Sequence, residues 1–110
     1  MGRDSLGELE HQVLLALLRV GPDAYSVPVL LELEGRTGRE VASAAVYNAL
    51  RRLEDKGYVR SRMQAPEAGE GGRDRRVFEV TAEGLHRLRE TRRALDRLWE
   101  GLDPLMERPS

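Results

Sequence analysis

The sequence predicts a mainly helical α+β fold, a winged helix-turn-helix with a further helix added at the C-terminus. Three segments whose apolar residues have helical spacing come first, two alternating segments around a glycine-rich stretch follow, and a long amphipathic segment comes last. The connection between the second and third helices is short. This order of helix, helix, helix, hairpin and helix is that of a winged helix-turn-helix domain.

Composition indicates one domain that has no disulfide bonds and no membrane span. The chain has 110 residues, a net charge of -1 and no cysteine. A chain of this length forms a single core by default, and without cysteine it has neither disulfides nor thiolate chemistry. No stretch reaches the length of a membrane span, and the charged start leads into an amphipathic segment rather than an apolar signal core. We therefore expect a cytoplasmic protein that does not contact membranes.

The first two helices follow from apolar spacing and from their end signals. The first is expected to begin at a capping box of Ser5 and Glu8 and to stop at the Gly-Pro pair in "RVGP". The second is expected from about Val27 and is closed by Gly35 or Gly38. Together they supply leucine- and valine-rich faces for one core.

The third helix, "SAAVYNALRRLEDK", has two contrasting faces. Its apolar face consists of Val46, Ala49, Leu50 and Leu53. Its polar face consists of Tyr47, Asn48, Arg51, Arg52 and Asp55. The apolar face is expected in the core, which leaves the polar face for solvent or a partner.

A hairpin and a long helix complete the prediction. "YVRSRMQA" and "RRVFEVT" alternate apolar and polar residues as half-buried strands do, and "PEAGEGGRD" between them predicts an exposed turn. Thr81 is expected to cap the last helix. We therefore divide the chain into a winged helix-turn-helix domain (1–80), a C-terminal helix (81–103) and a tail (104–110).

Four motifs in order resemble the PadR family of transcriptional regulators, of the short, single-domain kind. They are "LGELEHQVLLALL", "AYSVPVLLELEGRTG", "VYNALRRLEDKGYV" and "GGRDRRVFEVTAEGL", and the resemblance extends from Leu6 to about Leu102. It implies a dimeric winged-helix protein that binds double-stranded DNA, usually as a repressor. It also implies that a small aromatic or drug-like effector releases some members from DNA.

The middle of the chain is basic although the whole is not. Residues 36–76 carry ten basic and six acidic side chains, against two and six in residues 1–35. The amide of Asn48 can pair with adenine and the guanidinium of Arg51 with guanine, while wing arginines suit the minor groove or phosphates. The predicted DNA-contacting residues are Arg36, Arg39, Ser43, Tyr47, Asn48, Arg51, Arg52, Arg73, Arg75 and Arg76. The alternative for each one is an ordinary solvated side chain.

The last helix has the apolar spacing of a coiled-coil seam, with steps of three and four from Leu85 to Met106. Its apolar stripe is wider than one small core covers, so a second copy of the chain is the expected partner. The predicted interface residues are Leu88, Arg92, Leu95, Leu98, Trp99 and Leu102. By resemblance, Trp99 is also a candidate for stacking on a flat aromatic effector. The alternatives are packing within one chain, and an interface tryptophan without any ligand.

The leading functional hypothesis is a homodimeric, sequence-specific DNA-binding repressor, with residues 1–80 as the DNA-binding domain and residues 81–103 as the C-terminal dimerisation helix. The alternative is a winged-helix protein-interaction module that does not bind DNA, which the overall acidity favours. No enzyme, cofactor or metal site is expected, because the carboxylates are scattered and no nucleophile has an adjacent base. His11 and His86 lack ligand spacing.

Overall fold

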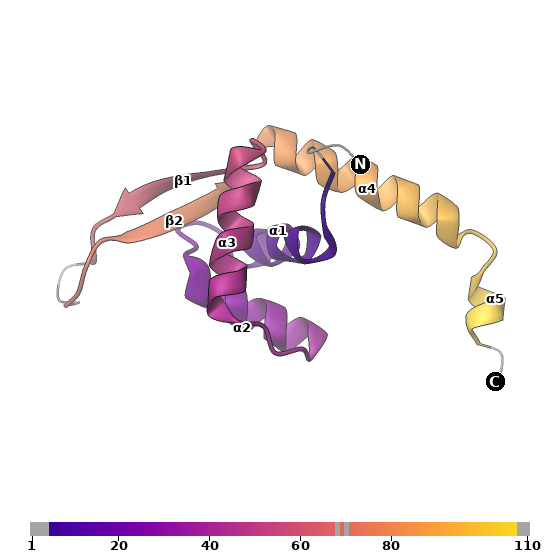
Figure 1. The fold of residues 1–110 in the computed structure, drawn as a ribbon, viewed down its shortest axis with the longest axis horizontal. Coiled ribbons are helices and arrows are strands. Elements are labelled where there is room, and N and C mark those ends of the chain that lie inside the picture. Colours follow the sequence, from indigo (N-terminus) through magenta and orange to yellow (C-terminus); the bar gives the residue numbers. More distant parts are fainter. Residues whose placement is uncertain (1–4, 68, 70, 108–110) are drawn as a thin grey trace.

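A computed structural model of the chain describes residues 5–67, 69 and 71–107 (Figure 1). In that part of the chain the elements follow the predicted order. They are α1 (Glu8–Val20), α2 (Ser26–Thr37), α3 (Ser43–Asp55), β1 (Val59–Gln64), β2 (Arg75–Val80), α4 (Ala82–Trp99) and α5 (Asp103–Met106). The mainly helical α+β fold and its winged helix-turn-helix class are confirmed.

The core lies where α1, α2 and α3 meet the inner face of the hairpin. Its largest fully buried side chains are Phe78, Leu14, Leu17, Leu50, Leu53, Val13, Val29, Val46 and Val59. The apolar face predicted for the third helix is buried in full, and burial of each of its valine and leucine side chains contributes roughly 1.5–3 kcal/mol. Burial of that face fixes which side of α3 meets solvent.

The start of α1 differs from the prediction. The N-cap is Gly7, and its N–H donates to the Glu10 carboxylate at 2.9 Å. The predicted capping box of Ser5 and Glu8 is therefore wrong by two residues. The physical reason is tertiary, because Lys56 of the segment after α3 also donates to Glu10, at 2.8 Å, and holds this carboxylate at the helix end.

The hairpin is a two-stranded antiparallel sheet, and its register runs from Val59 opposite Val80 to Gln64 opposite Arg75. It is attached to the helices at Phe78, whose N–H donates to the Ala24 carbonyl at 2.7 Å. Figure 1 shows the hairpin projecting from the helical body as a wing.

Helix α4 begins against the end of the hairpin and then leaves the body (Figure 1). Thr81 caps it as predicted, accepting the Gly84 N–H at 3.1 Å. Leu88 is the last α4 residue buried in the core. The Cα radius of gyration is 16.3 Å, against about 13 Å for a compact chain of this length, because the outer part of α4 projects.

The C-terminal end of the last helix also differs from the sequence prediction. The regular helix ends at Trp99, whereas the sequence predicts that it continues to residue 103. Asp103–Met106 forms the short helix α5, which crosses the predicted boundary between the last helix and the tail. Pro104 lies in the first turn of α5. Backbone N–H groups there have no partner within the helix, so the N–H that proline lacks is not needed. Of the helices that the structure describes, none is long and apolar enough to cross a membrane.

Candidate nucleic-acid interface

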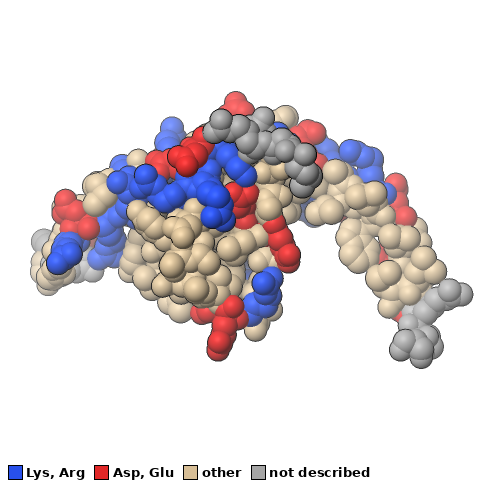
Figure 2. Space-filling view, viewed as in Figure 1, with Lys and Arg blue, Asp and Glu red and all other residues tan. Residues whose placement is uncertain are grey.

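The exposed face of α3 and the adjoining hairpin form the main basic surface. Figure 2 shows Lys and Arg side chains gathered across the hairpin and the neighbouring end of α3, with a largely uncharged area over the rest of α3. Protein cations that meet a nucleic acid usually contact phosphates and set the protein's position on the duplex. The surface therefore combines a charged margin with an uncharged centre.

The uncharged centre is the N-terminal half of α3. Ser43 and Asn48 are exposed there, as the prediction of base contacts requires. Tyr47 is 38% exposed, and its ring packs edge-on against Phe78 of β2 with the ring centroids 6.2 Å apart. Tyr47 therefore lies at the boundary between α3 and the wing and braces one against the other.

Beyond this centre, a chain of polar contacts joins α3 to the wing. Arg51 forms an ion pair with Glu54, with 3.5 Å between Nε and Oε1. The other carboxylate oxygen of Glu54 accepts the Ser61 hydroxyl at 2.5 Å, and the Ser61 oxygen accepts Arg76 Nη1 at 2.9 Å. Two of the predicted DNA-contacting arginines are therefore connected to Glu54, Arg51 directly and Arg76 through the Ser61 hydroxyl.

Arg52 is held on the side of α1. Its Nε lies 3.3 Å from Glu10, whose side chain is 7% exposed and also pairs with Lys56. Burial alone would raise the pKa of Glu10, but hydrogen bonds from Lys56 and from the Gly7 N–H outweigh it and hold the pKa below the usual 4.5. Arg52 thus belongs to an ion-pair cluster with Glu10 and Lys56.

The remaining predicted contacts lie on α2, on the connection after it and on the wing, and Arg36 lines a hollow between α1 and α2. Arg36 and Arg39 pair with acidic residues, at 3.2 Å from Glu32 and 3.4 Å from Glu8 respectively. These are exposed pairs that cost little to exchange for phosphate. In the wing, Arg73 is exposed, whereas the Arg75 guanidinium lies 4.3 Å from the centroid of the Tyr25 ring.

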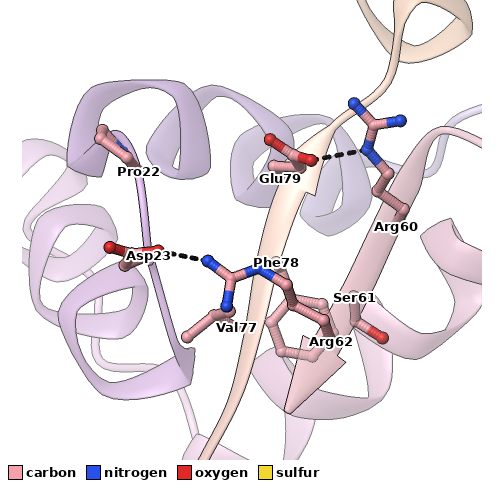
Figure 3. A pocket seen from close by; sticks show the side chains of 8 residues that line it. All are labelled: Pro22, Asp23, Arg60, Ser61, Arg62, Val77, Phe78 and Glu79. Atoms are coloured by element: carbon pink, nitrogen blue, oxygen red, sulfur yellow. Dashed lines mark hydrogen bonds and ion pairs between the residues drawn. The ribbon is translucent and has the colours of Figure 1, made fainter. Parts of the chain in front are cut away.

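The outer face of the hairpin carries two arginines that sequence reasoning did not assign. Figure 3 shows Arg60 directed at Glu79 and Arg62 directed at Asp23 of the α1–α2 turn, each pair 2.6 Å apart. They border a cavity of about 230 Å³. Because each of the two arginines is paired with one carboxylate, this face contributes less positive potential than its arginines suggest. Alternation along β1 could have separated these two arginines from Ser61, which lies on the α3 side.

A second candidate site lies between α1 and α4. It is an apolar groove of about 520 Å³, hereafter the α1–α4 groove, lined by His11, Leu15, Leu18, Leu85, Leu88, Arg89, Arg92, Leu95, Asp96 and Trp99. Burial lowers the pKa of His11 below 6.5, which favours its neutral form. Nothing in the described residues groups three His, Cys, Asp or Glu side chains as a metal site.

The predicted interface residues are exposed beside this groove with one exception. The exposed fractions are 43% for Leu95, 71% for Leu98, 50% for Trp99 and 37% for Leu102. Leu88 is 7% exposed and belongs to the core of its own chain, so it has little surface left for a partner. Its side chain is buried because α4 is still in contact with the helical body at that turn.

Comparisons with known proteins agree with this architecture. A family model described as the transcriptional regulator PadR-like family matches residues 14–90. A PadR family transcriptional regulator from Eggerthella lenta DSM 2243 is 28% identical, with 88% of this chain and 82% of that chain covered and a TM-score of 0.68. No curated protein matches the sequence significantly.

Two more distant structures share the fold. A PadR family transcription regulator from Clostridium difficile R20291 has a TM-score of 0.73 at 18% identity, with 91% of this chain and 99% of that chain covered. A transcriptional regulator from Thermoplasma acidophilum has a TM-score of 0.70 at 20% identity, with 94% and 100% covered. The family match includes all of α3 and the hairpin and ends within α4, before Leu95.

Proposed function

Because the chain belongs to the PadR-like family, whose members are transcriptional regulators rather than enzymes, we propose that it is a sequence-specific DNA-binding repressor that acts as a homodimer. The observation that carries the proposal is the surface of α3, which presents Ser43 and Asn48 together with Arg51 and Arg52 as exposed side chains of one helix. A helix of this kind enters the major groove, where amide and guanidinium groups can distinguish bases.

The wing supports the same mode of binding. Arg73 is exposed near the hairpin turn, and Arg76 projects from β2 on the α3 side, where its partner is Ser61. Both are available to phosphates that border the groove occupied by α3. Contacts of this kind set the register of the protein and carry little sequence information.

Binding to random duplex DNA over a salt series tests DNA binding as such. Phosphate contacts release counterions, so the logarithm of the binding constant must fall steeply and linearly with the logarithm of salt concentration. We expect such a slope, with a protein that binds at low salt. A flat response, or no binding at low salt, would favour the alternative function of a protein-interaction module.

The homodimer rests on the outer part of α4. Leu95, Leu98 and Trp99 face solvent from a helix that has left the body of its own chain. The α1–α4 groove offers an apolar surface for the same side chains of a second copy, and a two-fold axis makes such an interface self-complementary. In such a dimer, the two α3 helices would meet successive major grooves about 34 to 36 Å apart.

Repression follows from occupancy of a promoter by this dimer in the cytoplasm. A dimer that spans two successive major grooves would exclude polymerase from overlapping sequence. Transcription in a purified system from a promoter that contains the selected binding site should fall as protein is added. Increased transcription would reassign the protein as an activator.

Release by a flat aromatic effector is the last part of the proposal. Trp99 lines the α1–α4 groove with 50% of its surface exposed, so its ring is available for stacking. As Trp99 is the only tryptophan, its fluorescence reports this site alone. We expect planar cationic or phenolic compounds to quench it saturably and to weaken DNA binding, and Trp99→Leu to abolish the response. No quenching across such a panel would leave Trp99 with a packing role.

A further inference from the structure

An acidic side chain lies among the arginines at the charged margin of the basic surface. Glu54, on the last turn of α3, lies 3.5 Å from Arg51 of the same helix and 2.5 Å from the Ser61 hydroxyl of β1. Its side chain is 28% exposed. An acid in this position opposes the attraction of DNA phosphates, so its presence calls for a compensating role.

The contact through Ser61 reaches a second arginine. The Ser61 hydroxyl donates to Glu54 and accepts from Arg76 Nη1 at 2.9 Å. Ser61 pairs with Phe78 in the hairpin, so it lies on the strand face that is directed at the core and α3. Arg76 is two residues before Phe78 and shares that face. Glu54 is thus connected directly to Arg51 and, through one hydroxyl, to Arg76.

This connection joins two different elements of the fold, α3 and β2. Arg51 belongs to the helix that we propose for base contact, whereas Arg76 belongs to the wing that borders it. Each side chain loses rotamer freedom on binding unless it is already held in place, and a shared acceptor holds both in one relative arrangement. Arg75, which lies against Tyr25, has no part in this chain of contacts.

We propose that Glu54 is a positioning residue that sets DNA selectivity by fixing Arg51 and, through Ser61, Arg76 relative to each other. The proposal rests on the DNA-binding function proposed above. Its consequence is a separation of two effects. Loss of the acid raises the attraction for any DNA, because one opposing charge is gone, and at the same time lowers the preference for the correct sequence, because the two guanidinium groups are no longer aligned.

The test compares three variants of the full chain on two duplexes, namely one enriched by the wild-type protein from a random pool and a scrambled one. Glu54→Gln removes the charge and weakens both contacts. Ser61→Ala removes only the connection to Arg76 and leaves the charge. Asp55→Asn is the matched control, since it removes a charge from the adjacent exposed residue of α3, for which the described residues provide no ion pair.

We expect Asp55→Asn to strengthen binding to both duplexes by the same factor, about twofold to threefold. Glu54→Gln should strengthen binding to the scrambled duplex by a similar factor and reduce the ratio of the two affinities about tenfold. Ser61→Ala should leave binding to the scrambled duplex unchanged and reduce the ratio about threefold. Melting temperatures of the variants show that each is folded.

A readout without DNA accompanies the titrations. The Nε–H resonance of Arg51 and the Nη1–H resonances of Arg76 in nuclear magnetic resonance spectra should be protected from solvent exchange in the wild type and lose that protection in Glu54→Gln, while Asp55→Asn keeps it. Equal affinity ratios for Glu54→Gln and Asp55→Asn would overturn the positioning role and leave the DNA-binding function intact. A wild-type protein that does not discriminate between the duplexes would overturn both.

Discussion

At Gly84 the first turn of α4 lies directly on the backbone of Tyr58. A β-carbon at this position would collide with the Tyr58 carbonyl oxygen and come within 2.8 Å of Val80 Cγ1. The carbonyl already accepts the Thr81 N–H at 3.0 Å and cannot withdraw without breaking that bond. The direction in which α4 leaves the body therefore depends on the absence of one side chain.

Gly84→Ala should destabilise the protein by about 1–3 kcal/mol, because the clash exceeds the gain of roughly 1 kcal/mol in helix propensity. Gly35→Ala is the matched control. Gly35 lies in α2 with no atom within 4 Å of an added β-carbon, so we expect a gain of up to about 1 kcal/mol. Urea unfolding of both variants measures the difference. Equal stabilisation by the two changes would contradict the close packing at Gly84.

Glu10 predicts a pH dependence of stability. Its pKa is lowered in the folded protein, so its contribution is present above the unfolded value and is lost as the pH falls from about 4.5 through the folded pKa. Glu10→Gln should cost on the order of 1.5–3 kcal/mol at pH 7, because Lys56 and Arg52 lose a charged acceptor. The free energies of unfolding of variant and wild type should converge as the pH falls from about 4.5 through the folded pKa of Glu10. A constant difference across that range would contradict the role of the charge.

Helix α3 and the wing are expected to contribute differently to DNA binding. Arg51→Ala should weaken binding to the selected duplex by about 1–3 kcal/mol and relax the preference at one base pair per half-site. Arg73→Ala should weaken binding to all duplexes alike. It should also reduce the slope of the logarithm of the binding constant against the logarithm of salt concentration by about 1, the effect of losing one phosphate contact. Titrations on single-base variants of the selected duplex separate the two patterns. A uniform loss for Arg51→Ala would assign that residue to phosphate.

Helix α4 is expected to determine the oligomeric state. Leu95→Glu combined with Leu102→Glu places two charges on its apolar stripe and should make the protein monomeric at micromolar concentration, because a charge cannot be desolvated there without a partner. Leu31→Glu on α2 is the control, since Leu31 is 62% exposed and lies outside the α1–α4 groove. Sedimentation measures all three proteins. An unchanged dimer in the double variant would place the interface elsewhere.

For the whole molecule, local patterns were enough to predict the order of the elements and much of the buried set. The spacing of Val46, Ala49, Leu50 and Leu53 identified the buried face of α3, because a helix of regular pitch leaves few alternatives. The Thr81 cap was likewise confirmed. Such features depend on residues within one or two turns of each other.

What the sequence could not predict depends on distant partners. Glu10 and Lys56 are far apart along the chain, yet their contact holds Glu10 at the start of α1, where the N-cap is Gly7 instead of Ser5. Glu10 also forms an ion pair with Arg52. Glu54 and Ser61 meet only because the turn at Gly57 brings β1 beside the end of α3. No periodicity encodes such pairs. The sequence therefore predicts a set of exposed arginines, whereas in the structure several of them form ion pairs with glutamates.

The projection of α4 beyond Leu88 has a consequence for how the protein responds to its own abundance. The outer turns of this helix bury almost nothing against their own chain, and an isolated helix of that length is marginal in water. In the proposed homodimer, packing against the second copy would stabilise these turns, so helix formation and assembly would be one step governed by mass action. Far-ultraviolet circular dichroism should lose helical signal on dilution below the dimerisation constant. If the proposed dimer represses transcription, the protein would then occupy its promoter only above a threshold concentration in the cell.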